Sequence, residues 1–182
     1  LQKVVESMNL CDELENIPIF IYLDGGRNAK QEENLQIVKQ IRFKNKFVIK
    51  RSVNFGCDKN TIEMFNDVFD RLNFDYAFHV EDDFVFCKGY FKYCFNEFKR
   101  VQKEIDKNIG VFQGFSICFL TPEDKKQKLD AVIPTEKDHL WGCLYSRECY
   151  LSIKNKLSEY EKIVQKFPTN GFSKQYMIEV AK

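Results

Sequence analysis

The chain has 182 residues, of which 44% are hydrophobic and 15% aromatic, and this composition suits a globular domain with a sizeable core. Its 28 basic and 27 acidic residues leave a net charge of +1, so no bulk field attracts nucleic acid or an anionic membrane. No stretch approaches the roughly 20 apolar residues that a membrane span needs. We therefore expect a single domain over residues 1–182, with no membrane span and no nucleic-acid partner.

Helix-like and strand-like segments alternate along the first two thirds of the chain. Apolar residues at helical spacing predict helices over residues 1–14, 29–41, 61–72 and 88–105. Short apolar runs predict strands over residues 17–23, 46–52, 75–80 and 109–120, the last of them central in its sheet. Farther along we expect a charged turn or short helix at 121–128, an irregular or short-stranded region at 130–139, and two closing helices at 146–153 and 157–167.

The cysteines bear on the cellular compartment. The seven cysteines form no C-x-x-C pair, which argues against a structural zinc site. Several lie in apolar runs such as "VFCKGYFKYCF", where a free thiol packs as a small hydrophobe. This usage favours a reducing compartment, and we expect a cytoplasmic location. The chain opens without Met, directly in helix-like sequence, which indicates a fragment of a longer protein.

The alternation of strands and helices predicts an α/β fold, with a mainly parallel sheet and helices on both faces. In open α/β sheets, ligands bind beyond the carboxyl ends of the strands. Three polar clusters fall at such ends: "DGG" after the first strand, "NFGCDKN" after the second and "EDD" after the third. Their coincidence predicts a ligand site at one edge of the sheet.

The acidic triplet Glu81, Asp82 and Asp83 stands in "FHVEDDFVF", between two short apolar blocks. Adjacent carboxylates at a strand end can hold a divalent cation through hard oxygen ligands. The cation would offset their mutual repulsion and the charge of a leaving phosphate. The alternative is an acidic turn that points into solvent. The apolar flanks and the strand-end position favour a site for Mn²⁺ or Mg²⁺.

Asp24 and Gly25 end the first predicted strand. The carboxylate could accept hydrogen bonds from a nucleobase or a ribose, and the glycine would let the ligand approach closely. The alternative is a common Asp-Gly turn that ends the strand without touching any ligand.

The loop "RSVNFGCDKN" follows the second predicted strand. Asn54 and Gly56 could form a turn against a ligand, while Lys59 could reach a diphosphate beside the next helix N-terminus. Independently of any ligand, we expect Asp58 or Asn60 to cap a helix that begins near residue 61.

A further polar segment, "PTEKDHLWGCLYSRE", contains the only tryptophan. Asp138 or Glu136 could be a general base for an acceptor hydroxyl, and Trp141 could form a platform for a sugar ring. The alternative is a polar loop with a core tryptophan. His79 lies inside a predicted strand, and we expect a satisfied, partly buried side chain there.

Together these segments resemble the GT-A type of nucleotide-sugar glycosyltransferase, in particular the N-acetylglucosaminyltransferase I group and family 2 enzymes. The matching segments are "IPIFIYLDGGRNAKQEENLQIV", "VIKRSVNFGCDKNTIEMFNDVF" and "YAFHVEDDFVFCKGYFKYCFNEF", where E-D-D is a variant of the D-x-D motif. The resemblance covers roughly residues 1–151. It implies that Asp83 binds the metal with help from Asp82, that Asp82 and Glu81 lie near the ribose and the diphosphate, and that Asp138 is the base.

The resemblance implies a GT-A-like, Rossmann-like fold, with a first strand that would precede Leu1. It implies metal-dependent transfer of a hexosyl or N-acetylhexosaminyl unit, with inversion, from a UDP- or GDP-linked donor to a hydroxyl group of a glycan or another acceptor. Two alternatives stay open. One is a nucleotidyltransferase with a related sheet, and the other is an inactive module that binds carbohydrate or nucleotide.

Overall fold

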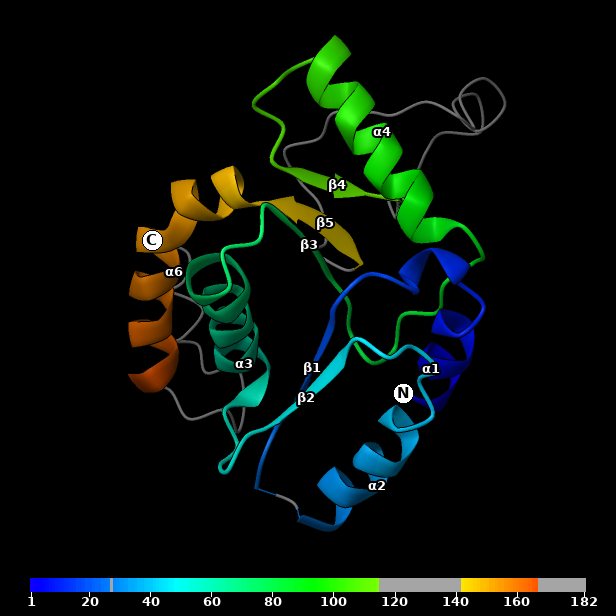
Figure 1. Ribbon diagram of the computed structural model, residues 1–182. Coiled ribbons are helices and arrows are strands. Elements are labelled where there is room, and N and C mark those ends of the chain that lie inside the picture. The colour runs from blue at the N-terminus through cyan, green and yellow to red at the C-terminus, as the bar shows by residue number, and fades with distance from the viewer. Residues whose placement is uncertain (27, 115–141, 167–182) are drawn as a thin grey trace, which may run out of the picture.

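The computed structural model describes residues 1–26, 28–114 and 142–166, and Figure 1 shows how their elements are arranged. The helices are α1 (Gln2–Met8), α2 (Asn28–Val38), α3 (Gly56–Phe65), α4 (Tyr90–Glu104) and α6 (Arg147–Lys166). The strands are β1 (Ile19–Leu23), β2 (Lys46–Lys50), β3 (Tyr76–His79), β4 (Val111–Gln113) and β5 (Cys143–Ser146). Within these ranges, no helix has the length and apolar character to cross a membrane.

The mixed α/β class is confirmed, but the described strands form two small sheets instead of one. β1 and β2 pair in parallel and are connected by α2, as a parallel pair requires a crossover. The second sheet has the order β3-β5-β4, and both of its pairings are antiparallel. The expected single, mainly parallel sheet is therefore not what the described part of the chain forms.

Strand β5 is the element that the sequence pattern missed. All four of its residues are buried, and it pairs with β3 along one edge and β4 along the other. We expect the strand over 109–120 to be central, but among the described strands β4 lies at the outer edge of its sheet; residues 115–120 lie outside the described residues.

Three helix boundaries differ from the predicted ones. α1 ends at Met8, and a separate 3₁₀ turn follows at Asp12–Leu14. α3 begins at Gly56, earlier than expected, and continues into a π-helical segment at Asn66–Arg71. The two predicted closing helices are one helix, α6, because its sequence contains no Gly or Pro that would interrupt it.

The core holds the sheets and helices in place around the site. α4 turns one face inward, and its buried residues are Tyr90, Phe91, Cys94, Phe98 and Val101. They join a cluster with buried residues of α1, α2 and β1. A second cluster packs the π-helical segment against β5 and α6. In Figure 1, α3 and α6 accordingly lie on one side of β1 and β2, while α1 and α2 lie on the other.

Candidate functional site

A cleft of about 680 Å³ lies between β1 and β3, and α1, α2 and α3 also contribute to its walls. Successive residues of both strands line it, over 17–25 and 76–82. Since neighbouring side chains of a strand point to opposite faces, a continuous run means that the strand edges face the cleft. The pairing agrees, because among the described strands β1 pairs only with β2 and β3 only with β5. The volume of the cleft is in the range of small-molecule sites.

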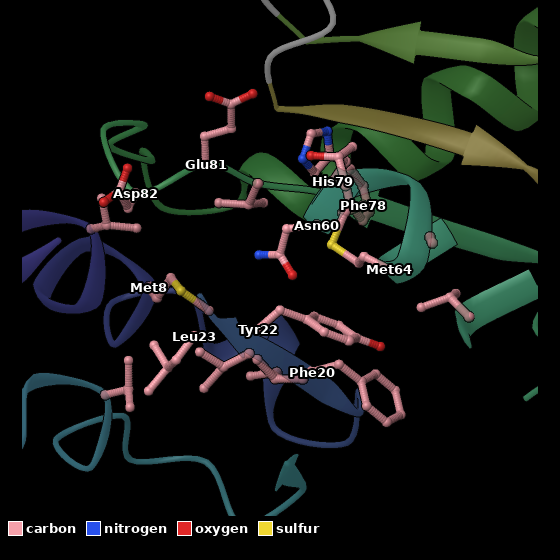
Figure 2. A pocket seen from close by; sticks show the side chains of 18 of the residues that line it. Met8, Phe20, Tyr22, Leu23, Asn60, Met64, Phe78, His79, Glu81 and Asp82 are labelled. Atoms are coloured by element: carbon pink, nitrogen blue, oxygen red, sulfur yellow. The ribbon is translucent and has the colours of Figure 1, made fainter. Parts of the chain in front are cut away.

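One end of this cleft is polar. The residues that line it there are Asp24, Gly25, Lys30, Gln31, Asn34, Asn54, Gly56, Cys57, Asn60, Glu81 and Asp82. Figure 2 shows Asn60 between the Tyr22 ring and Glu81, with Asp82 nearby. The sequence prediction that the ends of the first three strands form one site is consistent with this grouping.

The ends of β1 and β3 meet at the start of α3. Gly56 donates its backbone N–H to Oδ2 of Asp24 at 2.9 Å. The next residue, Cys57, is near Glu81: burial raises the pKa of its thiol, and the negative charge of Glu81 raises it further. The first turn of α3 therefore bridges the carboxyl ends of two strands that do not pair with each other.

Asp24 holds this junction together through both of its carboxylate oxygens. Its Oδ1 accepts hydrogen bonds from the backbone N–H groups of Gly25 at 2.9 Å and Phe55 at 2.7 Å, and its Oδ2 accepts one from Gly56. The carboxylate thus caps α3 from outside the helix. The prediction that Asp58 or Asn60 caps a helix beginning near residue 61 is wrong, since both residues lie inside α3.

The backbone beyond β1 is packed closely against the chain that follows β2. A Cβ atom on Gly25 would lie 2.6 Å from the carbonyl oxygens of Arg51 and Val53, so only glycine fits there. Gln31 of α2 adds a second link. Its Nε2 donates to the carbonyl oxygens of Leu23 at 3.3 Å and of Asp24 and Arg51 at 3.0 Å. Gly25 therefore has a packing role in this junction.

The acidic triplet lies directly after β3, where a turn closes between Glu81 and Phe84. Glu81 is half-buried, whereas Asp82 and Asp83 are exposed. Glu81 and Asp82 line the cleft, but Asp83 is not among its lining residues. Burial raises the pKa of the Glu81 carboxyl, and the charges of Asp83 and Asp82 raise it further. Within the described residues, no three His, Cys, Asp or Glu side chains are grouped so as to hold a metal ion.

Lys59 and Asn54 have partners within the protein. The Lys59 ammonium lies 3.9 Å from Oε1 of Glu161 and 4.7 Å from the centre of the Phe55 ring. It is not among the residues that line the cleft. Asn54 does line it, and its Oδ1 accepts a hydrogen bond from the backbone N–H of Gly56 at 2.9 Å. The loop is therefore ordered mainly by contacts within the protein.

Sequence reasoning missed three polar residues of this cleft on α2, namely Lys30, Gln31 and Asn34. Lys30 and Asn34 are four residues apart, so they lie on one face of the helix. Lys30 is exposed, and no carboxylate of a described residue pairs with it. These residues could have been found from the sequence, because they form a polar stripe on the helix that follows the Asp-Gly end of the first strand.

The remaining predicted residues divide into two groups. Asp138, Glu136 and Trp141 lie outside the described residues, so their roles stay predictions. His79 is 7% exposed, and its ring lies edge-on to Phe65 at 5.5 Å. It lies in β3, as expected, but it is more buried than the partly buried side chain that the sequence predicts.

Comparison of the chain with protein-family models, with curated proteins and with solved structures gives no match in any of the three. The geometry and chemistry of the cleft are therefore the basis on which a function can be proposed.

Proposed function

We propose that this chain is a GT-A-like domain of a metal-dependent glycosyltransferase, which moves a sugar from a nucleotide-diphosphate donor to an acceptor hydroxyl group. One observation carries the proposal. The carboxyl ends of β1 and β3 and the start of α3 converge on the polar end of one cleft, which carries Asn60, Glu81 and Asp82. Nucleotides bind at such strand ends in α/β proteins.

Two carboxylates at this end support the proposal of a divalent cation. Glu81 and Asp82 offer carboxylate oxygens, the hard ligands that Mn²⁺ and Mg²⁺ prefer. Burial and then the charges of Asp83 and Asp82 raise the pKa of Glu81, and a bound cation would offset the repulsion among these carboxylates. Such an ion would supply positive charge against a leaving diphosphate. We assign Asp82 and Glu81 to its binding, and Asp83 to raising the negative potential at Glu81.

The other residues of the cleft would position the donor. Asp24 fixes the loop that begins α3, so its contribution is to order the site. Lys30 carries a cationic side chain that lines the cleft and could contact a phosphate group. The sequence-based roles of Asp138 or Glu136 as base and of Trp141 as a sugar platform complete the proposal. The base would take the proton of the acceptor hydroxyl as the new glycosidic bond forms.

The decisive experiment combines donor binding with turnover. We expect UDP or GDP to bind in calorimetry only when Mn²⁺ or Mg²⁺ is present, and a UDP- or GDP-linked sugar to be hydrolysed or transferred slowly. Asp82→Ala should abolish both effects. Asp83→Ala, which removes an exposed carboxylate of the same turn, should retain them at reduced strength.

Several outcomes would contradict the proposal in different ways. Release of pyrophosphate from a nucleoside triphosphate and a sugar phosphate would identify a nucleotidyltransferase. Tight nucleotide binding with no turnover of any sugar donor would indicate an inactive binding module. No binding of any nucleotide, with or without metal, would exclude both enzyme classes. If Asp83→Ala abolishes metal-dependent nucleotide binding and Asp82→Ala does not, Asp83 is the metal ligand, as the resemblance implies.

A further inference from the structure

Asn60 occupies the centre of the polar end of the cleft. It lies on α3, and its amide points into the space between the Tyr22 ring and Glu81 (Figure 2). It is half-buried, so a ligand in the cleft can reach it. It is also near the point where the ends of β1 and β3 meet.

The amide of Asn60 has a fixed orientation. Nε of Arg51 donates a hydrogen bond to Oδ1 of Asn60 at 3.2 Å. Because the guanidinium group has donors only, the amide atom that it contacts must be the oxygen. The amide NH₂ group therefore points away from Arg51. In the described part of the chain, Nδ2 of Asn60 makes no hydrogen bond, so it can donate one to a ligand in the cleft.

Arg51 is itself held firmly, so it can impose this orientation. Its guanidinium carbon lies 5.1 Å from the centre of the Tyr22 ring and 5.2 Å from that of Phe55. Its Nη2 lies 3.6 Å from Oδ2 of Asp67, and only 14% of its side chain is exposed. Rotation of the Asn60 amide would set its NH₂ group against this cation, which is unfavourable.

A fixed donor gives the cleft a chemical preference. We infer that Asn60 is a specificity-determining residue whose Nδ2 donates to a ring carbonyl oxygen of the bound nucleobase; this inference depends on the proposed nucleotide-sugar function. An amide that is free to use both atoms binds adenine through one donor and one acceptor. The oxygen of Asn60 already accepts a hydrogen bond from Arg51, so among the described residues its NH₂ group is the part of the amide without a protein partner. The cleft therefore favours uracil over cytosine and guanine over adenine, since each favoured base has a carbonyl oxygen where the other has an amino group.

The test compares ratios of affinity, measured by calorimetry in the presence of Mn²⁺. For the wild-type protein we expect UDP to bind about fivefold to tenfold more tightly than CDP, and GDP to exceed ADP by a similar factor. Asn60→Asp is nearly isosteric and still accepts the hydrogen bond from Arg51, but it turns an acceptor toward the cleft. It should remove or reverse both preferences, whatever the added charge does to absolute affinity.

Asn96→Asp makes the same chemical change at an exposed position of α4, and it should leave both ratios unchanged. Urea denaturation of all three proteins checks that they remain folded. If the wild-type protein binds all four diphosphates equally, or if Asn60→Asp keeps the wild-type ratios, the role of Asn60 is wrong while the proposed function stands. If no nucleotide binds, the proposed function fails and this inference fails with it.

Discussion

Asp24 and the acidic triplet both follow a strand, and Asp24, Glu81 and Asp82 line the same cleft, yet the carboxylates at the two strand ends are in opposite situations. Both oxygens of Asp24 accept backbone hydrogen bonds, from Gly25, Phe55 and Gly56. For the triplet, no hydrogen bond or ion pair from a described residue reaches the side chain of Glu81, Asp82 or Asp83. Instead burial raises the pKa of Glu81, and the negative charges of Asp83 and Asp82 raise it further.

The difference teaches which strand-end carboxylates are available to a ligand. A carboxylate that caps a helix already has its charge compensated by N–H dipoles, and a ligand would have to displace those bonds. A carboxylate among like charges gains from any cation that arrives. Position at a strand end is therefore shared by both kinds of residue, and the pattern of hydrogen bonds separates them.

The largest expected effect is on stability, at the Asp24 junction. Asp24→Ala leaves the N–H groups of Phe55 and Gly56 without their acceptor, and hydrogen bonds to a charged group are the stronger ones. We expect a loss of about 3 kcal/mol in the free energy of unfolding. Urea denaturation followed by circular dichroism measures it.

The matched control is Asp83→Ala, which removes the same side chain from an exposed turn. Its free energy of unfolding should change by no more than about 0.5 kcal/mol. Equal losses in the two variants would show that Asp24 has no special structural role. The hydrogen bonds of Asp24 would then not distinguish it from the carboxylates of the triplet.

The same contrast explains how much of the fold could be predicted. β1, β2 and β3 are short apolar runs with polar ends, and local pattern is enough to find them. β5 was missed because a four-residue strand next to a helix carries little local signal. The start of α3 was missed for another reason. Its cap is Asp24, 31 residues before Phe55 in the chain, and a local search for a capping residue cannot find it.

The candidate site divides in a similar way. The sequence located the acidic triplet at the end of β3, because a strand that stops in "EDD" can be read directly. It could not say which of the three residues line the cleft, since that depends on the turn that closes at Phe84. The sequence could not show that Lys59 has a partner within the protein, because that partner, Glu161, is on α6, far along the chain.

The second prediction extends the comparison to cations. Lys30 lines the cleft and no described carboxylate pairs with it, whereas Lys59 has Glu161 and the Phe55 ring as partners. If the proposed function is correct, Lys30→Gln should weaken the binding of UDP or GDP with Mn²⁺ about fivefold, an effect of about 1 kcal/mol. Calorimetry under the conditions used for the wild-type protein measures it.

Lys59→Gln is the control, because it removes the same charge close to the cleft but outside its lining. We expect less than a twofold change in nucleotide affinity, with a slight loss of stability from the missing contact to α6. The opposite ranking of the two lysines would restore the sequence-based assignment of Lys59 and reject that of Lys30.

The smallest expected effect is at Glu81, and its sign tests the repulsion directly. The pKa of Glu81 is raised in the folded protein, mainly by burial and then by Asp83 and Asp82, so the charged form destabilises the fold at neutral pH. Glu81→Gln should therefore raise the free energy of unfolding at pH 7, by only about 0.5 kcal/mol because solvent screens the site. The gain should fade as pH drops through the raised pKa toward 4.5, since the wild-type side chain then becomes protonated in the folded state first.

Glu33→Gln removes one negative charge from the exposed surface of α2 and serves as the control for net charge. Addition of Mn²⁺ then distinguishes a turn with repelling carboxylates from a turn that also binds a metal ion. If Glu81 and Asp82 bind the cation together, Mn²⁺ should stabilise the wild-type protein more than Glu81→Gln, and the advantage of the variant at pH 7 should disappear. Equal stabilisation of the two proteins by Mn²⁺ would show that Glu81 does not bind the cation. The raised pKa of Glu81 would then reflect only burial and repulsion.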